Sequence, residues 1–152
     1  MRRSASTLTG VWSCERCGRS FANTNQTHTC APLGELDSHF AGKDRTVRET
    51  FDRFVAVAQE SGPVLVLPEK SRIALQVRMS FAALMPRRHW LNGHLVLARD
   101  AGSERFTKVE VFSPRNVLHA FRLTGPHEID DQFAAWIAEA YRVGAQQHLR
   151  HV

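Results

Sequence analysis

Residues 72–79, RIALQVRM, decide the class of fold, because apolar and mostly polar residues alternate along them. Successive side chains of a β-strand point to opposite faces, so this alternation predicts a strand with one buried face. Residues 80–86 continue the strand pattern. The remaining strands are predicted in four apolar segments, at residues 64–67, 90–98, 107–112 and 117–123. The connections are too short for crossover helices, so we expect a mainly antiparallel sheet of about five strands.

Helical periodicity flanks the predicted strands on both sides. Residues 44–61 and 130–143 carry apolar residues three and four positions apart, which places these residues on one face of a helix. The two stripes consist of Val47, Phe51, Phe54, Val55 and Ala58, and of Phe133, Trp136, Ile137, Ala140 and Tyr141. Asp44 is the predicted N-cap of the first helix. We therefore expect a two-layer α+β domain with both helices on one face of the sheet.

All three cysteines of the chain lie near its N-terminus, in the pattern Cys14-x2-Cys17 followed by His28-x-Cys30. Three thiolates and one imidazole are the donors that a closed, tetrahedral zinc site prefers. We expect one structural Zn²⁺ ion held by these four residues, with His39 as an alternative fourth ligand. A disulfide is disfavoured because the cysteine count is odd and the first ten residues lack the apolar core of a secretory signal.

The segment CERCGRSF, residues 14–21, resembles the first half of a classical zinc finger. In this resemblance Phe21 takes the place of the core aromatic residue of the finger. The second half departs from that pattern, because polar residues stand where the core leucine belongs and His-x-Cys replaces the paired histidines. The resemblance therefore supports a metal site, but it implies no helix that reads DNA bases.

Positive charge is concentrated in the predicted sheet. The chain has a net charge of +5, yet residues 70–125 alone contain ten basic and three acidic residues, an excess of seven. A local excess of this kind is typical of proteins that bind an anionic partner. An alternative explanation is genomic base composition, because 17 of the 20 basic residues are arginine.

Five basic residues form the candidate anion-binding surface: Lys70, Arg72, Arg78, Arg87 and Arg88. Arginine forks bind phosphates in a bidentate manner, and Trp90 beside them could stack on a base. Nucleic acid or another anionic ligand is therefore the expected partner. The alternative is that these side chains are simply the solvated face of the sheet. His119 and Arg122 are three positions apart, so at most one of them can join this surface.

The sequence favours a binding module over an enzyme, although it does not decide the matter. It contains no Gly-x-Ser-x-Gly motif and no phosphate-binding loop, and its acidic residues are not spaced for a catalytic metal site. A protein-interaction module or a small-ligand-binding domain is the alternative, and a metal-dependent hydrolase is a further one. No apolar segment approaches the ~18 residues of a membrane span. We expect a cytoplasmic protein without membrane contact.

Five segments of the chain are distinctive: HFAGK (39–43), VRETFDRFV (47–55), residues 62–91 with PEKSRIA and FAALMPRR, SPRNVLHAFRL (113–123) and IDDQFAAWIAEAY (129–141). Together they resemble a bacterial family of domains of unknown function, DUF5655. The resemblance implies an α+β fold and a prokaryotic origin, but no activity. Related domains occur attached to restriction-type and other nucleic-acid proteins. We therefore expect two units, a zinc module in residues 1–33 and an α+β domain in residues 34–152.

Overall fold

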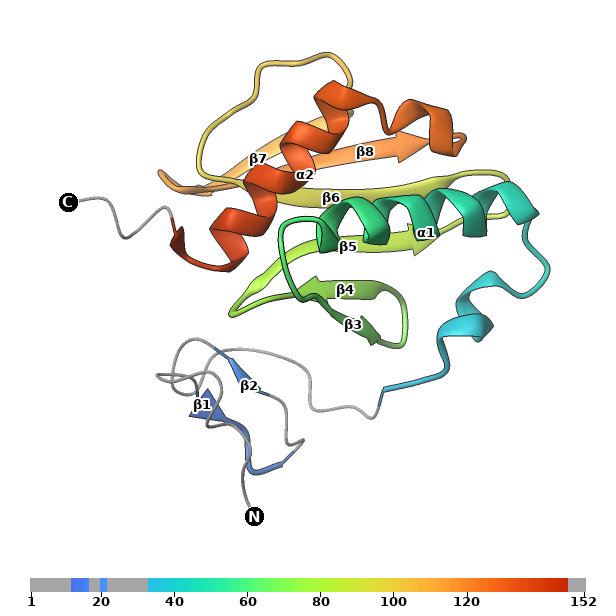
Figure 1. Cartoon of the computed structure of the whole chain (residues 1–152), viewed down its shortest axis with the longest axis horizontal. Coiled ribbons are helices and arrows are strands. Elements are labelled where there is room, and N and C mark those ends of the chain that lie inside the picture. The colour runs from blue at the N-terminus through green and yellow to red at the C-terminus, as the bar shows by residue number, and fades with distance from the viewer. Residues whose placement is uncertain (1–11, 17–19, 22–32, 148–152) are drawn as a thin grey trace.

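The computed structural model describes residues 12–16, 20–21 and 33–147 (Figure 1). Six strands form one antiparallel sheet in the spatial order β3-β4-β5-β6-β8-β7. Their bounds are β3 (Leu65–Pro68), β4 (Ile73–Gln76), β5 (Ser80–Pro86), β6 (Leu91–Leu97), β7 (Lys108–Ser113) and β8 (Asn116–Leu123). The helices α1 (Arg45–Gln59) and α2 (Asp131–Gly144) lie against one face of this sheet, and the short 3₁₀ helices η2 (Leu36–Phe40) and η3 (Pro126–Glu128) precede them.

The predicted two-layer α+β fold is confirmed for this part of the chain. Every pair of neighbouring strands is antiparallel, as the short connections indicated. One detail differs from the prediction. The sheet has six strands, because residues 72–86 divide into β4 and β5, with a register shift at Leu75/Gln76. The strands are not all in sequence order, since β8 lies between β6 and β7.

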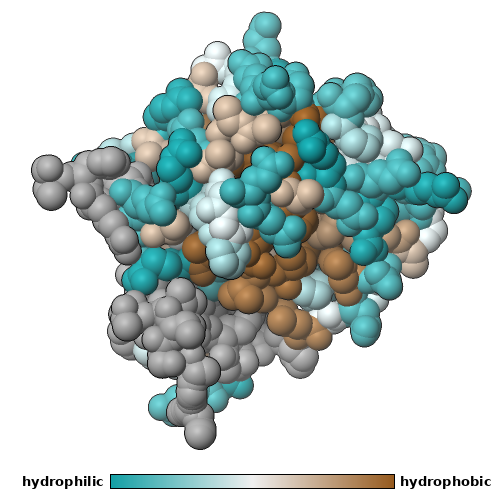
Figure 2. Space-filling model, in the orientation of Figure 1, coloured by the Kyte–Doolittle hydropathy of each residue, from teal (hydrophilic) through white to brown (hydrophobic). Residues whose placement is uncertain are grey.

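The core lies between the helices and the sheet. The inward-facing residues of β6, Leu91, Leu95 and Leu97, are fully buried. They pack against both predicted apolar stripes, whose aromatic members include Phe54 and Phe133. Burial of each such side chain contributes about 1.5–3 kcal/mol to the free energy of folding, relative to leaving it exposed to water. Figure 2 shows the molecule from the side of the two helices. The surface over the helices is mostly hydrophilic, and hydrophobic residues gather mainly near β3.

The two helices begin differently. Asp130 caps α2, because its Oδ1 atom accepts a hydrogen bond from the backbone N–H of Phe133 at 3.0 Å. Asp44 occupies the N-cap position of α1, as predicted, but makes no capping hydrogen bond. Its carboxylate instead accepts a hydrogen bond from His89 Nδ1 at 2.8 Å, which ties the start of α1 to the turn between β5 and β6.

The N-terminal segment contains a second, two-stranded sheet. Strand β1 (Trp12–Ser13) pairs antiparallel with β2 (Ser20–Phe21), and Trp12 is opposite Phe21. Cys14 follows β1 directly and is buried. None of the helices in the described part of the chain is long and apolar enough to cross a membrane.

Candidate anion-binding surface

Three chain segments meet at one end of the large sheet. The turn from β3 to β4 lies there because Pro68 is opposite Ile73. The turn from β5 to β6 lies at the same end because Pro86 is opposite Leu91, and Leu91 is in turn opposite Leu123, the last residue of β8. The antiparallel register therefore brings together basic residues that are far apart in the sequence.

We refer to these basic residues as the basic end of the sheet. All five are exposed: Lys70, Arg72, Arg87, Arg88 and Arg122. Four of them are residues that the sequence predicted, and Arg122 joins them from β8. Arg122 is opposite Asn92, on the face of the sheet that points away from the helices.

Backbone hydrogen bonds hold the turn that carries Arg87 and Arg88. The N–H of Arg87 donates to the carbonyl of Trp90 at 2.8 Å and closes the turn. The carbonyl of Arg88 accepts from the N–H of Asp44 at 2.9 Å, at the start of α1. The two guanidinium groups therefore extend from a fixed backbone, which lowers the entropic cost of binding a ligand.

Acidic residues neutralise part of the charge at this end. Glu69 forms an ion pair with Arg72 at 3.0 Å, and Asp44 contacts His89 at 2.8 Å. In the described part of the chain, no ion pair engages Arg87 or Arg88. These two arginines are therefore exposed cations that an external anion can reach without competition from a carboxylate.

An aromatic residue lies within the basic end. The guanidinium carbon of Arg122 is 4.3 Å from the centre of the Trp90 ring, a cation–π contact. The indole Nε1 of Trp90 is buried and has no hydrogen-bond partner among the described residues. The contact with Arg122 leaves only one face of the Trp90 ring for any other stacking partner.

Arg78 does not join the basic end, although we expected it to share a strand face with Arg72. Strand β4 ends at Gln76, after the register shift, so Arg78 lies in the turn at the opposite end of the strand. Its Nε donates to Gln146 Oε1 at 3.1 Å and its backbone N–H donates to the carbonyl of Gly144 at 3.2 Å. Arg78 therefore contacts the C-terminal end of α2.

His94 lies next to the basic end, on the same face of the sheet as Arg122. It is flanked by Ala83 on β5 and Ala120 on β8. Burial, together with a smaller effect of the charge of Arg72, lowers its pKa from 6.5 to about 4, against a still smaller opposing effect of Glu110. His94 is therefore uncharged at neutral pH and adds nothing to the positive charge of this face.

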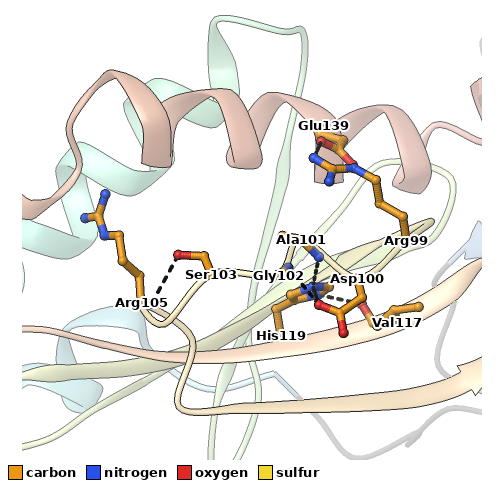
Figure 3. Close-up of polar contacts among 9 residues, drawn as sticks. All are labelled: Arg99, Asp100, Ala101, Gly102, Ser103, Arg105, Val117, His119 and Glu139. Carbon is orange, nitrogen blue, oxygen red and sulfur yellow. Dashed lines mark hydrogen bonds and ion pairs between the residues drawn. The ribbon is translucent and has the colours of Figure 1, made fainter.

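His119 lies on the opposite face of the sheet and is fully buried. Its Nδ1 donates to the carbonyl of Val117 at 3.0 Å, while its Nε2 accepts the N–H of Ala101 at 3.0 Å (Figure 3). This pattern requires the neutral ring with its proton on Nδ1. His119 thus anchors the loop between β6 and β7, and the expectation that it cannot share a face with Arg122 agrees with the register.

Two arginines fix the same loop to α2, and sequence reasoning missed both. Arg99 forms a bidentate ion pair with Glu139, with both contacts at 2.9 Å (Figure 3). Arg105 contacts Asp130, the N-cap of α2, at 2.8 Å. No local signal marks these pairs, because the partners are 40 and 25 residues apart in the sequence. These two arginines have a structural role. Part of the basic excess in residues 70–125 is therefore explained without an anionic partner.

The predicted zinc site falls mostly outside the described residues. Cys17, His28 and Cys30 are not among them, and only Cys14 is. Within the described residues, no three His, Cys, Asp or Glu side chains come together as a metal site would require. His39, the alternative ligand, donates from Nε2 to the carbonyl of Glu69 at 2.7 Å. The zinc assignment therefore remains a prediction from the sequence.

The fold and its basic end define a small α+β domain in which an antiparallel sheet carries two helices on one face. The chain belongs to the family DUF5655, a domain of unknown function, whose model matches residues 36–144. No curated protein and no solved structure gives a significant match. The family match carries no activity, so function has to be argued from the surface itself.

Proposed function

We propose that this protein is a non-enzymatic module that binds nucleic acid, with phosphates contacting the basic end of the sheet. The observation that supports this most directly is the pair Arg87 and Arg88, which is exposed and engaged by no carboxylate in the described part of the chain. Free arginine forks match the geometry of phosphate oxygens and supply the sequence-independent part of nucleic-acid affinity.

The neighbouring cations extend this contact along the end of the sheet. Lys70 lies in the turn before β4, and Arg122 lies at the end of β8, so the turn with Arg87 and Arg88 has a cation on each side. A chain of phosphates could follow such a row. The contact between Arg122 and Trp90 adds an aromatic surface of the kind on which bases stack, although one face of the ring is already covered.

We further propose that a structural Zn²⁺ ion, bound by Cys14, Cys17, His28 and Cys30, organises the N-terminal segment. The donor set and its spacing carry this proposal. The burial of Cys14 immediately after β1 is compatible with a ligand shielded from water. The free energy of zinc binding is about 10–16 kcal/mol in zinc-finger peptides. It would supply the folding free energy that the small apolar core of this segment lacks.

The nucleic-acid proposal is tested by the salt dependence of binding. Fluorescence anisotropy of labelled single-stranded and duplex oligonucleotides should show affinity that falls linearly with salt on logarithmic axes. The double substitution Arg87→Ala/Arg88→Ala should weaken binding and make the slope shallower by about 1.4 for single strands or 1.8 for duplex, the loss expected for two phosphate contacts.

A matched control separates the site from the overall charge. Arg53→Ala/Arg142→Ala also removes two exposed arginines, but from the two helices, and should leave the slope unchanged. An equal loss of affinity in both double variants would mean that the total charge of the protein, not the basic end, attracts the ligand. Absence of binding to any oligonucleotide at low salt would refute the proposal and favour a small anion or a protein as the partner.

A further inference from the structure

Strand β7 forms one edge of the large sheet and is unusually apolar for an exposed strand. Within the described residues β7 pairs only with β8, so its outer edge has no strand partner. Val111 and Phe112 are 67% and 63% exposed, the highest values among the large hydrophobic residues described. Exposed edge strands with apolar side chains readily pair with another strand, and natural proteins usually protect them.

The usual protection is limited in β7 to a register shift between Val111 and Ser113, next to the hairpin turn. The strand contains no proline, since Pro114 follows it in the hairpin turn to β8. Its two charged residues, Lys108 and Glu110, have opposite signs and lie 3.4 Å apart, with side chains 65% and 44% exposed. They point to the same face because they are two positions apart, opposite Ala120 and Leu118 of β8.

Residues 108–110 are basic, apolar and acidic in this order, which makes the strand complementary to a second copy of itself. When two copies pair antiparallel with Val109 opposite Val109, Lys108 of each copy is opposite Glu110 of the other. Two cross-strand ion pairs then form on one face, and Val111 is opposite Thr107. A register centred on Glu110 instead would place two carboxylates opposite each other, which is unfavourable.

We propose that β7 pairs with β7 of a second copy of this chain, across a twofold axis at Val109, and joins the two sheets into one. Such an interface is isologous, because the same strand is used by both copies. The pairing satisfies the outer backbone groups of β7 and partly covers Val111. This proposal does not depend on nucleic-acid binding, since β7 contributes no residue to the basic end.

A charge-swap cycle tests the proposal on the full chain by sedimentation equilibrium. The wild-type protein should show a reversible monomer–dimer equilibrium. Lys108→Glu places carboxylates opposite each other twice, and Glu110→Lys does the same with ammonium groups, so each should weaken the dimer on the order of tenfold. The double variant Lys108→Glu/Glu110→Lys restores both pairs and should restore the dimer.

Controls keep each outcome decisive. Lys108 is exposed and Glu110 is partly exposed, so the variants should keep the circular dichroism spectrum of the wild type. Arg142→Glu reverses an exposed charge on α2 and should leave the dimer unchanged. A wild-type protein that stays monomeric at its highest soluble concentration overturns the proposal. A dimer equally stable in all four proteins of the cycle also overturns it, because the interface must then lie elsewhere.

Discussion

The Nε2 atom of His119 lies 3.0 Å from the backbone nitrogen of Ala101 and accepts its hydrogen bond, so one buried ring on β8 holds the loop between β6 and β7. The loop must cross β8 to place β7 beyond it, and this contact lies at the crossing. The Phe106 ring packs edge-on against His119, 4.7 Å between centres, and closes the site from the loop side.

Replacement of His119 by alanine should therefore destabilise the protein by about 2–4 kcal/mol. The change removes a fully buried ring and leaves the N–H of Ala101 and the carbonyl of Val117 without their partner. Urea denaturation followed by circular dichroism measures the loss. The exposed His127 provides the control, and His127→Ala should have little effect. A loss for His119→Ala no larger than that of the control would contradict the anchoring role.

The lowered pKa of His94 predicts a specific dependence of stability on pH. A histidine with a pKa of about 4 in the folded protein and about 6.5 in the unfolded chain binds its proton more readily when unfolded. Stability should thus be full above pH ~6.5 and fall by up to about 3 kcal/mol as the pH drops towards 4. Urea midpoints across this range measure the effect, and His94→Asn should flatten the curve.

The cause of this shift can be tested separately by NMR titration of the His94 ring. Burial is the main cause and should persist in any variant that keeps the fold. Arg72 contributes repulsion, so Arg72→Gln should raise the pKa of His94, whereas Glu110→Gln should lower it. An unchanged pKa in Arg72→Gln would show that Arg72 does not approach His94 in solution.

The elements of the fold were predictable from local patterns, because burial on one face imposes a period on the sequence. The stripe containing Phe133 and Ile137 and the alternation of Leu91, Leu95 and Leu97 identify α2 and β6 correctly. The order of β7 and β8 was not predictable in the same way. The loop that leads from β6 to β7 is anchored by His119, and the sequence does not show whether a single histidine is buried or exposed.

The candidate surface illustrates the same limit. Lys70, Arg72, Arg87 and Arg88 reach one end of the sheet because hairpin connections bring consecutive strands side by side, which a sequence can indicate. Arg78 does not, because β4 ends at Gln76 and residues 77–79 connect it to β5. The register shift next to this connection leaves Phe81 of β5 without an opposite residue in β4, and no residue type in RIALQVRM signals where the strand ends.

Gly93 marks a position where the sheet and core leave no space for a side chain. A Cβ atom there would lie 2.7 Å from Phe121 Cζ, 2.8 Å from Leu84 Cδ2 and 2.9 Å from the carbonyl oxygen of Ala83. Gly93→Ala should cost about 1–3 kcal/mol, because the backbone oxygen cannot move aside. Gly34→Ala is the matched control, since its nearest neighbour would be 3.8 Å away. Equal stability of the two variants would mean that β6 shifts freely.

Substitution of Cys14 tests the zinc proposal at the one predicted ligand that the structure describes. The wild-type protein, dialysed against buffer without free metal, should retain one equivalent of Zn²⁺ by mass spectrometry. Cys14→Ala removes one of four ligands and should lose that ion, because structural sites use all four positions. His39→Ala should retain it, since the His39 ring is hydrogen bonded to the Glu69 carbonyl. Full zinc retention in Cys14→Ala would refute the assignment, and loss of zinc in both Cys14→Ala and His39→Ala would make His39 the fourth ligand in place of His28.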